Sequence, residues 1–231
     1  MVTRARGRSK KRTLAGQSSL FPPMDSHFCI ALDVETTGLR ADTDRVLQLG
    51  VVLGDNNFSP LWEGAITIDP DVAVPENVVG IHGLSNQMVD GCVSFAVAGR
   101  WLAPLIQDKI VIGHNVGFDL SFLSYEYERV SEKLPRLAGM IDSLSMSRYI
   151  LPRLRSHKLE WVCNELNIEI TRSHDACYDA LASLEIVRAL AQIQPKYLER
   201  SLTVSQTMYD ESDTHLMNLR QCNQGPESHF G

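Results

Sequence analysis

Acidic residues stand at three separated points of the chain, where a strand is expected to end or a helix to begin. These acids, and the histidine that accompanies them, are in chain order Asp33, Glu35, Asp119, His174 and Asp179. Carboxylate oxygens are the ligands that Mg²⁺ and Mn²⁺ prefer, whereas zinc favours nitrogen and sulfur. A histidine beside such a site can take a proton from water near neutral pH. These residue types predict a divalent-metal site for phosphoryl transfer, with the histidine as general base.

The first pair of acids belongs to the stretch ALDVETTGL (31–39). Because side chains alternate along a strand, Asp33 and Glu35 are expected on one side and Val34 on the other, in the core. Acids at the end of an apolar strand are costly unless a metal ion or a partner compensates them. Taken alone, the pair fits two exposed acids at a strand end equally well.

The other two stretches are GHNVGFD (113–119) and SHDACYDA (173–180). Asp119 and Asp179 each fall near the start of an expected helix, where an acid is stabilised by the helix dipole whether or not it has a further role. His174 precedes the second of these helices. The alternative to a general base at this position is a solvent-exposed loop histidine without a catalytic role. The metal site is favoured because three neighbouring elements each supply acids.

The elements that must position these residues are predicted from apolar patterning. Strands are expected at 28–34, 45–54, 61–69, 109–115 and the start of 139–151, and helices at 94–107, 118–130, the rest of 139–151, 158–167 and 175–193. The first strand is apolar on both faces, which is typical of a central strand. Three consecutive strands with short links indicate an antiparallel meander. This order predicts an α/β protein with a mixed five-stranded sheet flanked by helices.

Charged residues are distributed unevenly along the 231-residue chain. Residues 1–12 hold six of the 22 basic residues and no acid, so the remainder carries 16 basic and all 28 acidic residues, a balance of −12. An acidic body argues against sequence-independent duplex binding through phosphates alone. We predict a disordered basic arm (1–27), one folded domain (28–194) and a polar tail (195–231).

The three acidic stretches resemble the exonuclease motifs of the DEDDh family. DVETTGL corresponds to D-x-E, HNVGFD to the second aspartate motif and HDACYD to H-x4-D. The linking stretches GIHGLS and IDSLSMSR are more narrowly similar to the epsilon-type (proofreading) subunit of bacterial DNA polymerase III. The resemblance covers residues 28 to about 192. It implies an RNase H-like fold and a 3′→5′ exonuclease that releases nucleoside monophosphates from single-stranded DNA, in replication proofreading or repair.

The resemblance also implies what individual residues do. Two divalent ions, Mg²⁺ or Mn²⁺, would be held by Asp33, Glu35, Asp119 and Asp179. Asp33 would bridge both ions, and His174 would be the general base.

For the terminal nucleotide, the resemblance implies binding by the turn that follows the first strand and by the GIHGL loop (80–84). The residues concerned are Thr36, Thr37, Gly38, Leu39 and His82. His82 has an alternative interpretation as a loop histidine that holds local backbone.

Two other functions stay open at this point. An RNA 3′-end trimming exoribonuclease of the same family would share the same catalytic motifs. A non-enzymatic scaffold that only binds nucleic-acid ends is expected to lose motif residues, whereas all five are present here.

The basic arm contains the stretch QSSLF (17–21). Gln17, Leu20 and Phe21 resemble the peptide with which bacterial replication proteins bind the sliding clamp, and such a peptide would bind weakly on its own. The alternative is that Leu-Phe packs on the protein's own body. A DNA polymerase is a second expected partner.

Cysteine usage and the absence of a long apolar run bear on location. The five cysteines are scattered and never in CxxC spacing, which favours a reducing compartment. No apolar run is long enough for a membrane span or a signal-peptide core, so we predict a cytoplasmic protein. The basic N-terminus also resembles an organellar transit peptide or a nuclear signal, which we place below a bacterial cytoplasmic origin.

Overall fold

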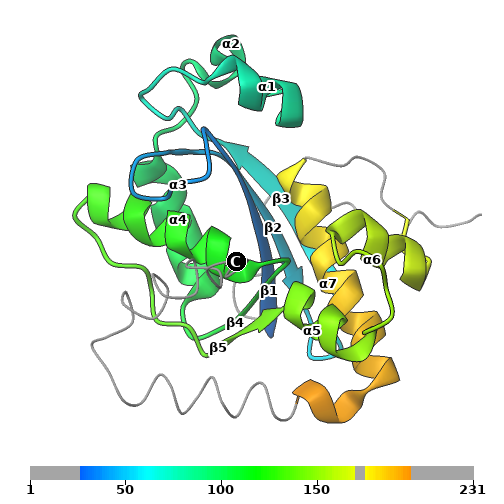
Figure 1. Ribbon diagram of the computed structural model, residues 1–231. Helices are drawn as coiled ribbons and strands as arrows, with labels where there is room; N and C mark the ends of the chain where they lie inside the picture. Colours follow the sequence, from blue (N-terminus) through cyan, green and yellow to red (C-terminus); the bar gives the residue numbers. More distant parts are fainter. Residues whose placement is uncertain (1–26, 170–174, 199–231) are drawn as a thin grey trace, which may run out of the picture.

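A five-stranded sheet runs through the centre of the computed structural model, which describes residues 27–169 and 175–198 (Figure 1). Its strands are β1 (Cys29–Thr36), β2 (Val46–Gly54), β3 (Pro60–Thr67), β4 (Ile110–Gly113) and β5 (Gly139–Asp142). The order across the sheet is β3-β2-β1-β4-β5. The first three strands form an antiparallel meander, and β4 and β5 continue the sheet in parallel with β1. The predicted mixed sheet with a central first strand is confirmed.

The described residues form seven named helices, of which the last five in chain order pack on the sheet. They are α1 (Glu76–His82), α2 (Asn86–Val89), α3 (Phe95–Ile106), α4 (Val116–Arg129), α5 (Ser143–Ile150), α6 (Leu159–Leu166) and α7 (Ala176–Ile193). Helices α3 to α7 lie close to the ranges expected from the sequence. Helix α4 begins earlier than expected, at Val116, because Asn115 turns the chain in the left-handed conformation at φ 74° directly after β4.

The two helices α1 and α2 were not expected. They have seven and four residues, too few for a clear apolar period. The prediction of a loop at 80–84 is therefore wrong at its start, because residues 80–82 belong to α1. Gly83 then ends that helix in the left-handed conformation, at φ 78°.

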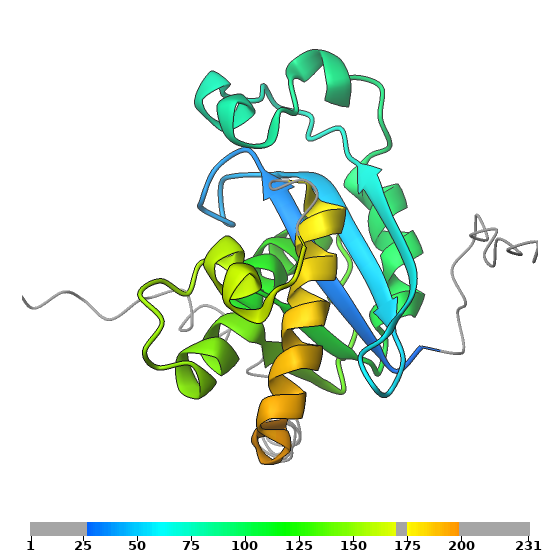
Figure 2. The same cartoon turned by 90° about the vertical axis from the view of Figure 1, so that its right-hand side faces the viewer.

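Helices cover both faces of the sheet (Figures 1 and 2). Helices α3 and α4 pack on one face, and α7, with α5 and α6 beside it, packs on the other. Strand β1 supplies both cores, because Ile30 and Leu32 face α3 and α4 whereas Cys29 and Ala31 face α7. Burying an aliphatic side chain of this size contributes about 1.5–3 kcal/mol. This double burial fixes β1 at the centre and sets the direction in which its polar end projects.

Helices α1 and α2 form a small lobe beyond the carboxyl end of β1 (Figure 2). The lobe has its own apolar cluster, in which Val74, Val78, Leu84 and Val89 surround Leu47 of β2. It therefore stands over the end of the sheet where the acidic residues emerge.

The end of α7 follows the expected pattern. The helix stops at Ile193, and residues 195–198 form one further helical turn that begins at Pro195. In that turn the ring of Tyr197 lies 5.1 Å from the ring of Tyr149.

Among the helices that the structure describes, none is long and apolar enough to cross a bilayer.

Candidate active site

Three of the predicted carboxylates meet at the carboxyl end of β1. Asp33 and Glu35 lie on the face of β1 that α7 covers, and Asp179 comes from the first turn of α7. One carboxylate oxygen from each of the three lies within 4.8 Å of the others. The alternation predicted for ALDVETTGL is thus observed, and it directs the two β1 acids toward the helix that carries the third.

Strand β2 allows α7 to approach this closely. Gly50 pairs with Asp33 across the sheet, and a Cβ atom at Gly50 would lie 2.0 Å from the carbonyl oxygen of Ala176. The side chain of Gln48, which pairs with Glu35, accepts a hydrogen bond of 3.1 Å from the backbone N–H of Ala176. The start of α7 therefore rests directly on β2, opposite the two acids of β1.

Asp119 reaches the site from the other side of β1. Parallel pairing between β1 and β4 ends at Ala31 and Ile112. Beyond that point, the edge of β1 that faces β4 has no strand partner among the described residues. The carboxylate of Asp119, in the first turn of α4, accepts a hydrogen bond of 3.0 Å from the backbone N–H of Val34. Asp119 is only 3% exposed. It therefore lies next to Asp33 while it completes the hydrogen bonding of β1.

Burial and mutual repulsion raise the pKa values of these acids. The pKa of Asp33 is raised well above its usual range by burial and then by the charges of Asp119, Asp179 and Glu35. Burial, followed by the charge of Asp179, raises the pKa of Glu35 to about 7. Burial raises the pKa of Asp119 to about 8, although the N–H of Val34 opposes this. Such a cluster is unfavourable as bare carboxylates near neutral pH.

The donor set fits a divalent cation. The clustered ligand atoms are all carboxylate oxygens, which suit hard ions such as Mg²⁺ or Mn²⁺ better than zinc. No ion pair to Asp33, Glu35 or Asp119 exists among the described side chains. A cation between the acids would thus supply the positive charge that the described side chains do not.

The turn after β1 places the predicted nucleotide-binding residues beside the carboxylates. Thr37 makes two hydrogen bonds of 2.9 Å with the backbone of Arg45, one through its N–H and one through its hydroxyl oxygen. The hydroxyl of Thr36 donates to the carbonyl oxygen of Gly38 at 2.5 Å. Leu39 projects from this braced turn and is 83% exposed. The turn therefore offers an apolar side chain to solvent next to the acidic cluster.

A buried ion pair anchors this turn, and the sequence interpretation missed it. Glu126 of α4 is 1% exposed and binds the Arg45 guanidinium through both oxygens, at 2.8 and 3.1 Å. Its carboxylate also accepts from the N–H of Val46 at 3.1 Å and lies 3.3 Å from the guanidinium of Arg129. An acid on the apolar side of a helix was the one available signal, because such an acid needs a partner.

The remaining predicted residues differ in what the structure says of them. His82 is the last residue of α1, and its Nδ1 accepts from the N–H of Leu84 at 3.1 Å, so it holds local backbone. His174 lies outside the described residues, and so do Gln17, Leu20 and Phe21.

The fold and the site together define the class of protein. A β3-β2-β1-β4-β5 sheet with acids converging from β1, α4 and α7 is the RNase H-like arrangement predicted from the motifs. The exonuclease family model matches residues 30–187. The chain therefore belongs to the exonuclease family, and the predicted family is confirmed.

Curated relatives agree with this family. DNA polymerase III PolC-type of Oceanobacillus iheyensis is 30% identical over 165 residues, which is 71% of this chain and 11% of the relative. The 3′-5′ exonuclease DinG of Bacillus subtilis is 28% identical over 207 residues, or 85% of this chain and 21% of the relative. The chain thus spans about a ninth to a fifth of the length of these relatives.

Solved structures share the fold at lower identity. E. coli exonuclease I in complex with a dT13 oligonucleotide superposes with a TM-score of 0.66 at 20% identity, covering 74% of this chain and 42% of that one. Exonuclease X in complex with 5′ overhanging duplex DNA gives 0.61 at 14% identity, covering 76% of this chain and 98% of that one. The RNase H-like exonuclease fold is confirmed by both.

Proposed function

We propose that this protein is a metal-dependent 3′→5′ exonuclease that removes nucleoside monophosphates from the 3′ end of single-stranded DNA. The observation that carries the proposal is the meeting of Asp33, Glu35 and Asp179 within 4.8 Å, with Asp119 buried beside them. Such a set of oxygens, on this fold, suits phosphodiester hydrolysis.

Each part of the site has a proposed task. Asp33, Glu35, Asp119 and Asp179 would hold two Mg²⁺ or Mn²⁺ ions. When bound, these ions supply activation of water and stabilisation of charge on the leaving 3′ oxygen. His174 is the proposed general base that takes the proton of the attacking water.

The turn 36–39 is proposed to hold the terminal nucleotide. Its backbone is fixed by the Thr37–Arg45 hydrogen bonds, so it needs little reordering when substrate binds. The exposed Leu39 offers an apolar surface for the base or sugar, and the α1–α2 lobe with His82 stands over the same end of the sheet.

The names of the relatives support DNA as substrate and replication or repair as context. One is a PolC-type DNA polymerase III, and one solved structure holds a dT13 oligonucleotide. We therefore propose a role in replication proofreading or repair. A DNA polymerase is the proposed partner, and Gln17, Leu20 and Phe21 are proposed to bind a sliding clamp. We also infer a cytoplasmic location, because Cys29, Cys92, Cys163 and Cys177 are all free thiols.

The deciding experiment compares matched single-stranded DNA and RNA, each labelled at the 5′ end, with and without Mg²⁺. We expect stepwise shortening of the DNA from its 3′ end, release of nucleoside 5′-monophosphates and no reaction with chelator. Faster shortening of the RNA would instead establish an exoribonuclease. End binding without any cleavage would establish a non-enzymatic scaffold.

A further inference from the structure

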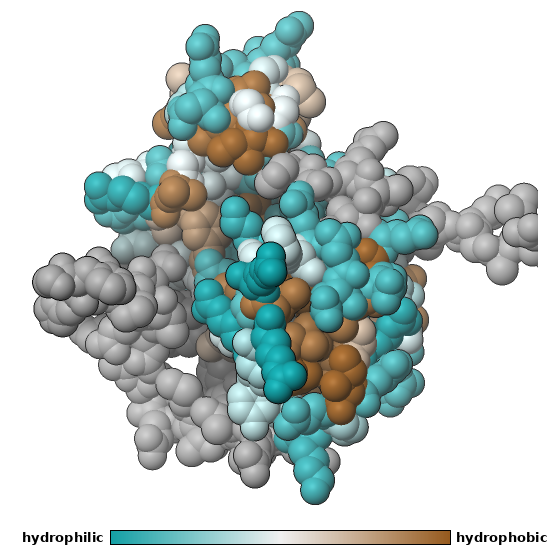
Figure 3. Space-filling model, turned by 45° about the vertical axis from the view of Figure 1, so that its right-hand side comes forward, coloured by the Kyte–Doolittle hydropathy of each residue, from teal (hydrophilic) through white to brown (hydrophobic). Residues whose placement is uncertain are grey.

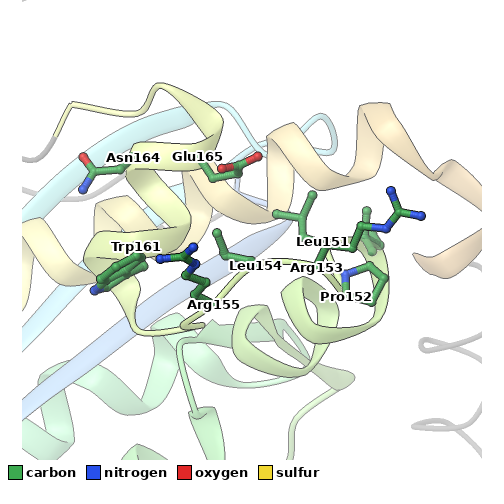
Figure 4. A pocket seen from close by; sticks show the side chains of 9 residues that line it. Leu151, Pro152, Arg153, Leu154, Arg155, Trp161, Asn164 and Glu165 are labelled. Atoms are coloured by element: carbon green, nitrogen blue, oxygen red, sulfur yellow. The ribbon is translucent and has the colours of Figure 1, made fainter.

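A groove lies between α6 and the segment that follows α5. It encloses about 840 Å³, and residues 151–155 form one wall while α6 forms the other (Figure 4). Arg155 and Trp161 lie at one end of the groove and Pro152 and Arg153 at the other. None of these residues takes part in the site described above, and we call this feature the α5–α6 groove.

One wall of the α5–α6 groove is basic, although the body of the protein is acidic. Residues 143–159 contain no acid, and their four Lys and Arg residues are Arg148, Arg153, Arg155 and Lys158, all exposed. Within the part of the chain that the structure describes, none of the four enters a salt bridge. Of these four, Arg153 and Arg155 line the groove itself, whereas the α6 wall contributes Glu165, so the positive charge of the lining lies on the 151–155 side. This positive charge is complementary to the phosphate backbone of one nucleic-acid strand.

The same groove exposes a large aromatic ring and an apolar floor. Trp161 is 48% exposed, and Leu154 and Leu151 line the groove between this ring and Pro152 (Figure 4). Figure 3 shows an apolar patch on the face turned forward, bordered by strongly hydrophilic side chains. The other two tryptophans, Trp62 and Trp101, pack against each other and against the core on the α3–α4 side. Exposed aromatic rings beside arginines are the arrangement on which single-stranded bases stack.

The groove begins at the end of the sheet that carries the acids. Strands β1, β4 and β5 are parallel, so their carboxyl ends share one edge. At that edge Nε2 of His114, directly after β4, donates to the carbonyl oxygen of His157 at 2.7 Å, and Nδ1 of His114 lies 2.8 Å from the hydroxyl of Ser143. The basic segment is thereby attached to the strand that neighbours β1. The other wall is close as well, because Val162 and Cys163 of α6 share an apolar cluster with Ala180 of α7, the residue after Asp179.

We propose that the α5–α6 groove binds the single-stranded DNA that leads to the 3′ end, with Arg153 and Arg155 on its phosphates and Trp161 stacked on a base. The proposal rests on the exonuclease function proposed above and adds a second substrate subsite away from the carboxylates. It explains how an acidic protein holds a polyanion, because the favourable contacts are gathered on one segment.

The first test separates strand binding from the chemistry. The double variant Arg153→Ala/Arg155→Ala is compared with the control Arg100→Ala/Lys133→Ala, which removes two exposed charges elsewhere. Both are assayed on an oligothymidylate of about 16 nucleotides and on the p-nitrophenyl ester of thymidine 5′-monophosphate. We expect KM for the oligonucleotide to rise about tenfold only in the groove variant, and the salt slope of binding to fall by about 1.4. Hydrolysis of the small ester, which reaches only the carboxylates, should stay unchanged.

The second test uses Trp161 itself and needs only a conservative replacement. In full-length Asp33→Asn protein, the same oligonucleotide should quench tryptophan fluorescence, and Trp161→Phe should abolish most of that change while binding remains. Trp161→Ala should weaken binding by about 5- to 100-fold.

The outcomes distinguish the two proposals. Unchanged KM and salt slope in the arginine variant, or quenching that persists in Trp161→Phe, would overturn the groove while ester hydrolysis continues. Absence of both ester hydrolysis and DNA shortening in the unmodified protein would overturn the exonuclease function itself.

Discussion

Gly50 and Ala176 are in contact in a way that only glycine permits. A Cβ atom at Gly50 would lie 2.0 Å from the carbonyl oxygen of Ala176, far inside the contact distance of real atoms. Gly50 is also the strand partner of Asp33. The missing side chain on β2 thus lets α7 settle on the sheet and brings Asp179 to the acids of β1.

Gly50→Ala should therefore damage both the fold and the site. The clash is with backbone, so α7 must shift, at a cost of about 1–3 kcal/mol in the free energy of unfolding. Exonuclease activity should fall by at least about 100-fold, because a small displacement of a reacting group is costly. Denaturant unfolding and single-strand hydrolysis measure the two effects.

Gly80→Ala is the matched control for this change. Gly80 lies within α1, and a Cβ atom there meets nothing within 4 Å. The substitution should raise stability by about 0.5–1 kcal/mol through helix propensity, whereas Gly50→Ala should lower it. Equal damage at both positions would contradict the role given to Gly50.

Asp33→Asn should separate stability from activity. The amide removes a buried negative charge from between Asp119, Asp179 and Glu35, so the metal-free protein should unfold at a higher temperature than the unmodified one. Activity should be lost, because the proposed bridging ligand is gone. Thermal unfolding in chelator and exonuclease assays in Mg²⁺ test this, and a lower unfolding temperature would argue against repulsion in the cluster.

Metal-free stability should fall as pH rises. In the folded state the pKa of Glu35 is about 7 and that of Asp119 about 8, both above their ordinary values of 4.5 and 3.8. Between the ordinary and the raised pKa values the folded protein binds more protons than the unfolded chain, so stability decreases with pH. This loss of folding stability is absent below about pH 4 and complete above about pH 8.

Mg²⁺ should remove most of this pH dependence. A bound cation favours the ionised acids, so its stabilising effect should be larger at the alkaline end of the range. Thermal unfolding from mildly acidic to mildly alkaline pH, with Mg²⁺ or with chelator, provides the measurement. Parallel curves under the two conditions would refute a cation site at these acids.

Glu126→Gln should weaken substrate binding more than the chemical step. The substitution leaves the guanidinium of Arg45 without its buried counter-charge, which should cost about 3–5 kcal/mol of stability. The turn 36–39 would lose its anchor to α4, so KM should rise with a smaller change in kcat. Glu132→Gln, at an exposed position after α4, is the control and should alter neither. A fall in kcat alone would show that Glu126 does not act through the turn.

His174→Gln should lower kcat by about 10²–10⁴-fold if the histidine is the general base. Binding of single-stranded DNA should persist, because the carboxylates and the turn 36–39 are intact. The pH profile of the residual activity should lose its histidine-like limb. A profile that keeps this limb would assign the base to another group.

The sequence by itself determined the order of the elements along the chain, the antiparallel meander and the central position of β1, and it predicted the acids that could bind metal. Those features have local signatures, since apolar alternation marks a strand and D-x-E at its end marks the acids. The prediction of the family followed from the same stretches, and the comparison with known exonucleases confirms it.

The tertiary structure alone decided which distant groups support the site. Gly50 beneath Ala176, Glu126 beneath Arg45 and Asp119 on the N–H of Val34 join elements that are far apart along the chain. The apolar periodicity of the sequence does not predict such pairs, because each pair depends on how two separate elements pack against each other. Helices α1 and α2 were missed for the related reason that they are too short to show a period and depend on a small core of their own.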